Sequence, residues 1–245
     1  MRDKELKVFG DPQSGRLNSD DSPFAVNVNE WVNAENVRSG STDKGATGIV
    51  ESVGGNVSIP SPANLPSVVI GGQKWTLNNL DVTSYRNGDP INFISNSVDW
   101  AAATEGAWCW YNDNPATGIK LYNWFSVNDI RGLAPFGWRI PTNIEYATLS
   151  AYLGGNSVSG GELKSVTGWD SPNTGATNSS GFTALPNGFR DLSGDFAGQT
   201  SLGIFWTSDG DPILDYGLSK TLAYNSAAIT TSAFDSKKSG YSIRL

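Results

Sequence analysis

Two groups of carboxylates have the residue type and the spacing that acid–base catalysis would need. Asp209, Asp211 and Asp215 form one group, and Asp191 and Asp195 form the other. A glycoside hydrolase uses two carboxyl groups at a set separation, and their pKa values differ. Both groups here are interleaved with glycine, and aspartate beside glycine typically forms turns. We therefore expect turns at these positions and assign no catalytic residue.

Nucleophilic and imidazole chemistry is also restricted. The sequence contains no histidine and one cysteine, Cys109, which stands between Trp108 and Trp110. Serine hydrolysis with a histidine base is excluded, and one cysteine cannot form an intrachain disulfide. No cationic neighbour is evident that would lower the pKa of the thiol, so we expect a small buried hydrophobic group. The chain is predicted to be no enzyme and to carry no cofactor.

A mixture of aromatic, carboxylate and amide side chains begins at Trp206. Sugar rings stack on aromatic faces, while amides and carboxylates hydrogen-bond to sugar hydroxyl groups. Trp206 itself is expected in the core, as are Trp124, Trp138 and Phe205. The predicted ligand-binding residues are Asp209, Asp211, Tyr216, Tyr224 and Asn225.

The elements that position these groups include two predicted helices. Residues 120–128 place large side chains on one helical face. Residues 142–145 (TNIE) form a capping box, and apolar residues follow it at helical spacing. Gly154 is a suitable end for this second helix.

Short strands make up the rest of the predicted fold. Residues 67–70 and 73–76 flank Gly71 and Gly72, a pattern typical of a β-hairpin. Further strands are predicted at 182–185, 204–207, 219–224 and 240–245. Two helices followed by a set of short strands is an α+β layout.

The charge of the chain argues against two classes of partner. The formal net charge is −7, which opposes attraction to nucleic-acid phosphates and to anionic lipid headgroups. The N-terminus has no apolar region of a secretory signal. No stretch reaches the ~18 apolar residues of a membrane helix. We expect no nucleic-acid partner, no membrane insertion and no signal peptide.

A series of aromatic, glycine and proline landmarks runs from near Ser67 to Leu245. The landmarks lie at residues 72–80, 85–91, 107–115, 121–129, 132–142, 181–190, 205–208 and 239–244. Their order resembles the Fibrobacter succinogenes major paralogous domain, a branch of the C-type-lectin-like fold related to the formylglycine-generating enzymes. The resemblance implies an α+β domain with two helices, a twisted antiparallel sheet and a long loop region.

The resemblance also implies two kinds of site, and neither matches this sequence. The formylglycine-generating relatives use a cysteine pair and a related branch uses histidine-bound iron, which this chain cannot supply. Sugar-binding C-type lectins hold calcium with Glu-Pro-Asn or Gln-Pro-Asp and with Trp-Asn-Asp. Residues 185–187 read LPN and residues 111–113 read YND, so no full set of calcium oxygens is visible. We expect Asx turns there and assign no metal ligand.

Residues 1–57 form a small polar segment, followed by a proline-rich linker at 58–66 and the C-type-lectin-like domain at 67–245. The run 33–43, followed by 48–51, resembles the opening of some phage tail proteins, including those of crAss-like phages. In that interpretation the segment docks onto other virion subunits; the alternative is a flexible polar leader. The expected docking residues are Phe24, Trp31, Val37 and Arg38.

A recognition domain without an export signal needs another route out of a cell, and assembly into a phage particle is one. We therefore hypothesise a non-enzymatic structural and recognition protein of a tailed-phage virion, made in the host cytoplasm and oligomeric in the particle. Its partners would be other tail proteins and a host-surface glycan or protein. The alternative is a host bacterial surface-type binding module of the same family.

Overall fold

The structure, a computed structural model, describes residues 61–211 and 216–245. The chain separates into two units between Ile59 and Pro60, and the described residues belong to the second unit. The predicted boundaries at 57 and 67 stay predictions. The docking residues predicted above, Phe24, Trp31, Val37 and Arg38, lie outside the described residues.

The first element is a β-hairpin whose turn consists of two glycines. β1 (Ser67–Ile70) pairs with β2 (Gln73–Thr76) in antiparallel register. Gly71 and Gly72 have φ values of 57° and 84°, which residues with a Cβ atom rarely adopt. The predicted hairpin is confirmed.

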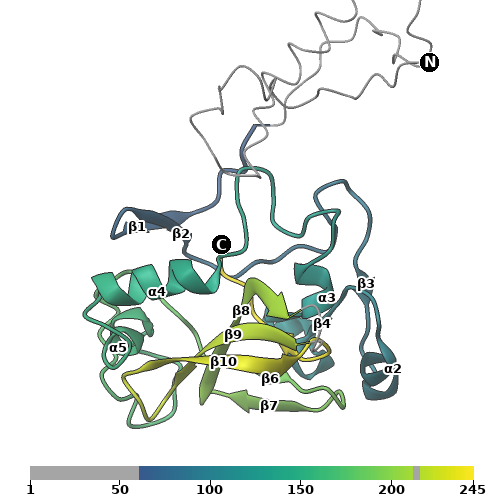
Figure 1. Ribbon diagram of the computed structural model, residues 1–245. Helices are drawn as coiled ribbons and strands as arrows, with labels where there is room; N and C mark the ends of the chain where they lie inside the picture. The colour runs from purple at the N-terminus through teal and green to yellow at the C-terminus, as the bar shows by residue number, and fades with distance from the viewer. Residues whose placement is uncertain (1–60, 212–215) are drawn as a thin grey trace, which may run out of the picture. The chain divides into compact units, whose positions relative to one another are not determined.

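The longest described helix, α4 (Asn143–Tyr152), begins where the capping box predicts. The Thr142 hydroxyl accepts a hydrogen bond from the Glu145 N–H, and the Glu145 carboxylate accepts one from the Thr142 N–H. Gly154 follows the helix with a φ of 94°. The helix packs against the sheet with Tyr146 and Leu149 buried, and Figure 1 shows it at the opposite end of the domain from α2.

The helix predicted at 120–128 is wrong in its first half. Residues 120–123 form a strand, β5 (Lys120–Asn123), and the helix α3 is confined to Trp124–Val127. β5 pairs with β4 (Ala107–Trp110), so pairing within the sheet overrides the helical pattern. Asn123 then caps α3, because its side chain accepts a hydrogen bond from the Ser126 N–H at 3.1 Å.

A nine-stranded sheet, in the order β10-β9-β8-β6-β11-β5-β4-β3 with β7 paired to β6, forms the body of the domain. The remaining strands are β3 (Asn92–Phe93), β6 (Asn187–Arg190), β7 (Phe196–Gln199), β8 (Leu202–Asp211), β9 (Tyr216–Ala223), β10 (Ile229–Ser236) and β11 (Gly240–Tyr241). The sheet is mixed rather than wholly antiparallel, because β3–β4 and β6–β8 are parallel pairs. The α+β class is confirmed.

The other strand predictions are confirmed in part. Residues 204–207 lie in β8, and most of 219–224 lies in β9, as predicted. Residues 182–185 form no strand, since Thr183 has a φ of 55° and only Ala184 makes an isolated bridge. The described residues also include two helices that the sequence did not predict, α2 (Ser97–Ala102) and α5 (Ser159–Leu163).

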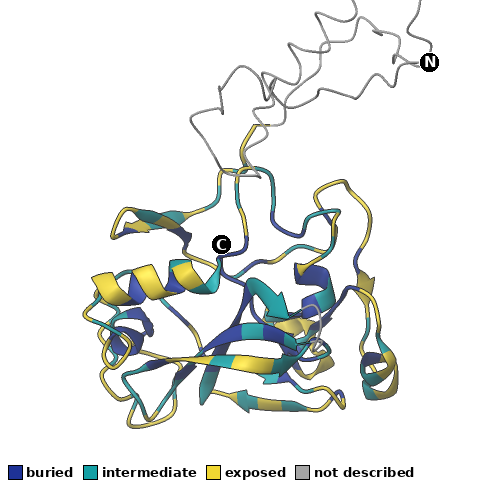
Figure 2. Cartoon of the chain, viewed as in Figure 1, coloured by how far each residue is buried: buried dark blue, intermediate teal, exposed yellow. Residues whose placement is uncertain are grey.

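The core follows the central strands, which Figure 2 shows as buried, while the outer face of α4 is exposed. Trp206, Phe205 and Trp124 are buried as predicted, whereas Trp138 is half-buried. Among the described residues, no helix combines the length and the hydropathy that crossing a membrane requires.

Candidate functional site

The structure separates the five predicted ligand-binding residues into two groups. Asp209 and Asp211 lie at the end of β8, and Tyr216, which pairs with Asp211, begins β9. Tyr224 and Asn225 follow the far end of β9. Because a strand rises about 3.3 Å per residue, the eight residues of β9 place the groups roughly 25 Å apart. The five residues therefore do not line one site.

Asp209 binds the beginning of α4. Its carboxylate accepts a hydrogen bond from the Asn143 N–H, and its own N–H donates to Thr207 Oγ1 at 3.2 Å. A carboxylate at this position is favoured by the free N–H groups and the dipole of the helix. Beside it, Lys220 donates to Asn143 Oδ1 at 2.6 Å, and burial lowers the pKa of Lys220. This cluster joins α4 to β9.

The other predicted residues also make contacts within the fold. The Tyr216 ring packs edge-on against Phe234, with 5.8 Å between centroids. The Tyr224 N–H donates to the Ser201 carbonyl at 2.9 Å. Asn225 is exposed in the turn after β9. The roles of Tyr216, Tyr224 and Asn225 in ligand binding stay predictions.

Of the residues considered above as calcium ligands or catalytic acids, Asn112, Asp113 and Asp191 lie in turns. The turns expected at the others are wrong where the structure describes them, because Asp209 and Asp211 lie in β8 and Asn187 lies in β6, while Asp215 lies outside the described residues. Asn112 and Asp113 have φ values of 56° and 52° within a short 3₁₀ helix. The Asp191 carboxylate accepts hydrogen bonds from the N–H groups of Ser193 and Asp195, both at 2.9 Å. Within the part of the chain that the structure describes, no three His, Cys, Asp or Glu side chains cluster as metal ligands would.

The single thiol is buried in β4. Burial raises the pKa of Cys109 to about 12, so the thiol stays protonated at neutral pH. Since the thiolate is the nucleophilic form, this environment makes Cys109 unreactive. The expectation of a small buried hydrophobic group is confirmed.

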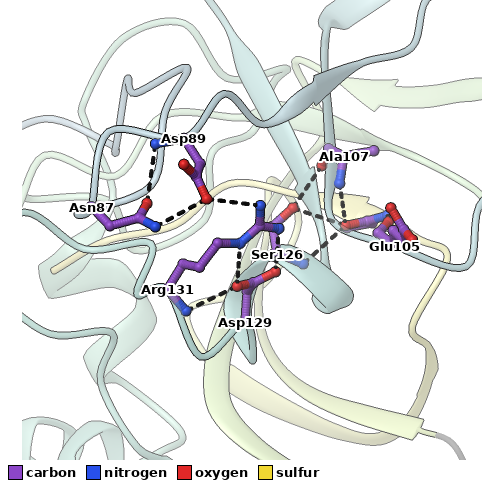
Figure 3. Close-up of polar contacts among 8 residues, drawn as sticks. Asn87, Asp89, Glu105, Ala107, Ser126, Asp129 and Arg131 are labelled. Atoms are coloured by element: carbon purple, nitrogen blue, oxygen red, sulfur yellow. Dashed lines mark hydrogen bonds and ion pairs between the residues drawn. The ribbon is translucent and has the colours of Figure 1, made fainter.

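A polar cluster that we call the Arg131 clamp joins two loops through Tyr85, Asp89, Asp129 and Arg131, of which Figure 3 shows the last three. Arg131 donates from Nε and Nη2 to the two Asp129 oxygens at 2.9 and 2.8 Å, and its Nη1 lies 3.5 Å from Asp89. Its guanidinium stacks 4.0 Å from the centre of the Tyr85 ring. The hydrogen bonds from Arg131 hold the pKa of Asp129 at about 2. These groups bind one another rather than facing an open site.

A groove with a volume of about 530 Å³ lies between the segment after β2, residues 117–120 and the C-terminal residues. We call it the polar groove. Its polar side chains include Asn78, Asn79, Asp81, Lys120 and Asn187. Its apolar side chains include Leu65, Leu77, Val82, Ile119 and Leu185. This volume and this mixture are typical of small-molecule binding sites.

Arg244 fixes one wall of the polar groove from beneath. This almost fully buried side chain donates to the carbonyl oxygens of Thr76 at 2.8 Å, Leu77 at 2.6 Å and Phe182 at 2.9 Å. Its Nε donates to Asn79 Oδ1 at 3.0 Å. The backbone of residues 76–79 is therefore set by the core.

Tyr122 fixes the next part of the same wall. Its hydroxyl accepts a hydrogen bond from the Val82 N–H at 2.8 Å and donates to the Val82 carbonyl at 2.7 Å. The Leu80 N–H donates to the Ile243 carbonyl at 2.8 Å. The wall of the groove is therefore held by contacts within the fold.

An aromatic row, formed by Phe93, Trp108 and Trp110, lies beside the polar groove. Phe93 and Trp108 are 4.8 Å apart between ring centroids, and Trp108 and Trp110 are 5.4 Å apart. The Lys120 ammonium lies 5.1 Å from the Trp108 ring and 4.7 Å from the Trp110 ring. Since Lys120 also lines the groove and pairs with the Asp81 carboxylate, it joins the row to the groove.

The row and the groove together provide two kinds of contact. Aromatic faces accept the apolar face of a sugar ring, and amide or carboxylate groups bind its hydroxyls. Trp108 is buried and Trp110 is half-buried, so the 51% exposed Phe93 is the ring of the row most open to a ligand. The Asp81 side chain is 71% exposed. No catalytic pair of carboxylates is present in the groove, where Asp81 is the acidic residue.

The mixture of aromatic, carboxylate and amide residues after Trp206 favoured that region as the site instead. Two signals in the sequence pointed to the row and the groove. Trp108 and Trp110, two residues apart, share one face of a strand, and Asn78, Asn79 and Asp81 form a polar run directly after the hairpin. The contact with Lys120 depends on the pairing of β4 and β5, which the sequence analysis did not predict.

Comparison with known proteins bears on the family of the chain. The family model described as the Fibrobacter succinogenes major domain matches residues 68–245, which is more than half of the chain. No curated protein and no solved structure matches this chain.

Proposed function

The chain belongs to the Fibrobacter succinogenes major domain family, and we propose that it is a non-enzymatic recognition protein that binds a cell-surface saccharide. The observation that carries the proposal is the polar groove beside the aromatic row. Its walls are fixed by Arg244 and Tyr122. A site formed in advance avoids the entropic cost of ordering on binding.

The chemistry of the chain favours recognition over catalysis. The sequence has no histidine, and burial keeps the thiol of its one cysteine protonated. Asp209 and Asp191, from the two carboxylate groups considered above, use their oxygens in a helix cap and a turn. The groove offers hydrogen bonds and apolar surface, which are enough to hold a saccharide.

We also propose that the domain is C-type-lectin-like and that residues 1–57 attach it to a tailed-phage virion. The order of aromatic, glycine and proline landmarks supports the fold. The likeness of residues 33–43 and 48–51 to the opening of some phage tail proteins supports a location in the virion. A proteome of purified particles tests the location: detection of this chain among tail proteins supports it. If the neighbouring genes encode surface lipoproteins and this chain is absent from purified particles, the alternative of a bacterial surface module is favoured.

Saccharide binding is tested with the full chain on a glycan array, followed by calorimetry with a ligand found there. Asp81→Asn, which removes a charge in the groove, should weaken binding about tenfold. Asp195→Asn makes the same change at an exposed turn residue and should leave affinity unchanged. Equal affinities of the wild type and Asp81→Asn, or no array ligand at all, would contradict the proposal.

A further inference from the structure

Two buried polar atoms on β2 have no hydrogen-bond partner among the described residues. They are Gln73 Oε1 and the indole Nε1 of Trp75, a residue that is 2% exposed. Side chains two residues apart on a strand point to the same face. Buried polar groups are nearly always hydrogen-bonded, so an unpaired acceptor and an unpaired donor side by side point to a ligand.

The orientation of the Gln73 amide is determined by its neighbour. Its Nε2 donates to the Glu145 carbonyl oxygen at 3.1 Å. A carbonyl oxygen only accepts, so the amide cannot be turned to place Oε1 there. Oε1 is therefore the atom that stays without a donor.

Both residues line a second pocket, of about 380 Å³, between β2, residues 137–141 and the beginning of α4. Leu245 is the one residue it shares with the lining of the polar groove. The rim carries Trp138, whose Nε1 donates to the Ala63 carbonyl at 2.7 Å, and Lys74, whose ammonium lies 5.0 Å from that ring. The pocket is therefore a separate site with an aromatic rim.

The charged side chains of the pocket other than Lys74 are already paired. The Glu145 carboxylate accepts hydrogen bonds from Arg139 and from the Thr142 N–H. Among the buried side-chain atoms of the residues that line the pocket, the two without a partner are one donor, on Trp75, and one acceptor, on Gln73. A neutral ligand with one acceptor and one donor fits this pattern.

We propose that this pocket binds the acetamido group of an N-acetylated amino sugar. The carbonyl oxygen of the group accepts from Trp75 Nε1–H, and its N–H donates to Gln73 Oε1. The sugar ring then lies at the rim, against Trp138 and within reach of Lys74. The proposal adds a second site to the proposed saccharide-binding function and does not depend on the polar groove.

The test is proton–nitrogen NMR of the full, ¹⁵N-labelled chain, whose nine tryptophans give nine indole N–H signals. Trp75→Phe identifies the Trp75 signal by its loss. Addition of N-acetylglucosamine should move that signal downfield in a saturable way, whereas glucose and glucosamine should not. Asp81→Asn, in the polar groove, should leave this titration unchanged, so failure of the groove and failure of this pocket are distinguishable.

Gln73→Leu is the second variant, and it should weaken the binding of N-acetylglucosamine about tenfold. Gln199→Leu makes the same change at an exposed position of β7 and should have no effect. An unmoved Trp75 signal, or equal shifts with glucose, would overturn the proposal. Tighter binding of N-acetylglycine methylamide than of the sugar would also overturn it, because the ligand would then be a peptide.

Discussion

The polar groove and the Arg131 clamp are both clusters of charged and polar side chains, and they differ in how much hydrogen-bonding capacity is already used. In the clamp, both Asp129 oxygens accept hydrogen bonds from Arg131, and Asp89 Oδ2 also accepts one from Asn87 at 3.0 Å. In the groove, Asn78 and Asp81 are exposed.

A polar cluster keeps its hydrogen-bonding groups available for a ligand when other residues hold its backbone, and the proposed binding role of the groove rests on this difference. Arg244 and Tyr122 fix residues 76–82 from the core side. Apart from the Lys120–Asp81 pair, the polar side chains of the groove therefore need not bind one another to keep their positions. In the Arg131 clamp the side chains themselves connect the two loops, beside the hydrogen bond from the Arg86 N–H to the Gly132 carbonyl at 2.7 Å.

The largest effect is expected for Arg244→Met, which removes the support of the groove. Three buried carbonyls and Asn79 lose their donor, so the free energy of unfolding should fall by roughly 3–5 kcal/mol. Urea denaturation measures the change, and calorimetry should find no saccharide binding. Arg139→Met, at a side chain 76% exposed, should cost less than about 1 kcal/mol. If both variants are equally stable, Arg244 is not the support of the wall.

Tyr122→Phe tests a single point of the same wall and should have a smaller effect. The variant keeps the ring but leaves the Val82 N–H and carbonyl without the hydroxyl, at a cost of about 1–3 kcal/mol. Amide hydrogen exchange should accelerate at Val82, and the affinity of the groove for its saccharide should fall. Unchanged exchange at Val82 would show that other contacts hold this segment.

Phe93→Ala tests the aromatic row without touching the groove. Loss of one stacking ring should weaken binding of an oligosaccharide about threefold to tenfold. A monosaccharide bound in the groove should keep its affinity, because Phe93 is separated from Lys120 by the Trp108 ring. Phe234→Ala, at another exposed phenylalanine, is the matched control. Equal losses for short and long ligands would remove the row from the proposed site.

Much of the fold could be predicted where the signal is local. The Gly71-Gly72 turn needs positive φ values, and the 142–145 capping box acts within four residues, so both were found at their positions. Residues 120–123 were misassigned, because their helical pattern lost to strand pairing with β4, about ten residues away. A single sequence does not show which segments will pair.

The candidate site was harder to predict for the same reason. The sequence predicts Asp209 as an exposed ligand-binding carboxylate, and only the fold brings it to the N-terminus of α4. Lys120 joins the aromatic row because its strand pairs with the one that carries Trp110. Arg244 supports the groove from a position about 165 residues away from Asn79 along the chain. Such contacts come from topology, not from spacing.

The smallest expected effect concerns the pH dependence of the Arg131 clamp. Hydrogen bonds from Arg131 lower the pKa of Asp129 from its ordinary value of 3.8 to about 2 in the folded chain. A lowered folded-state pKa stabilises the protein above the unfolded value, and this contribution is lost as the pH falls from about 4 to about 2. Asp129→Asn should therefore melt below the wild type near pH 6, and the difference should shrink over that acidic range.

Thermal melts at pH steps between 6 and 2 measure this difference, and Asp195→Asn controls for the loss of one carboxylate at an exposed turn. Because Asp129 is partly solvated, the effect should amount to a few degrees at most. The saccharide affinity of Asp129→Asn should equal that of the wild type, since the clamp lies outside the groove lining. A constant melting difference down to pH 2 would mean that the Asp129 charge does not stabilise the clamp, and a lost affinity would mean that clamp and groove are coupled.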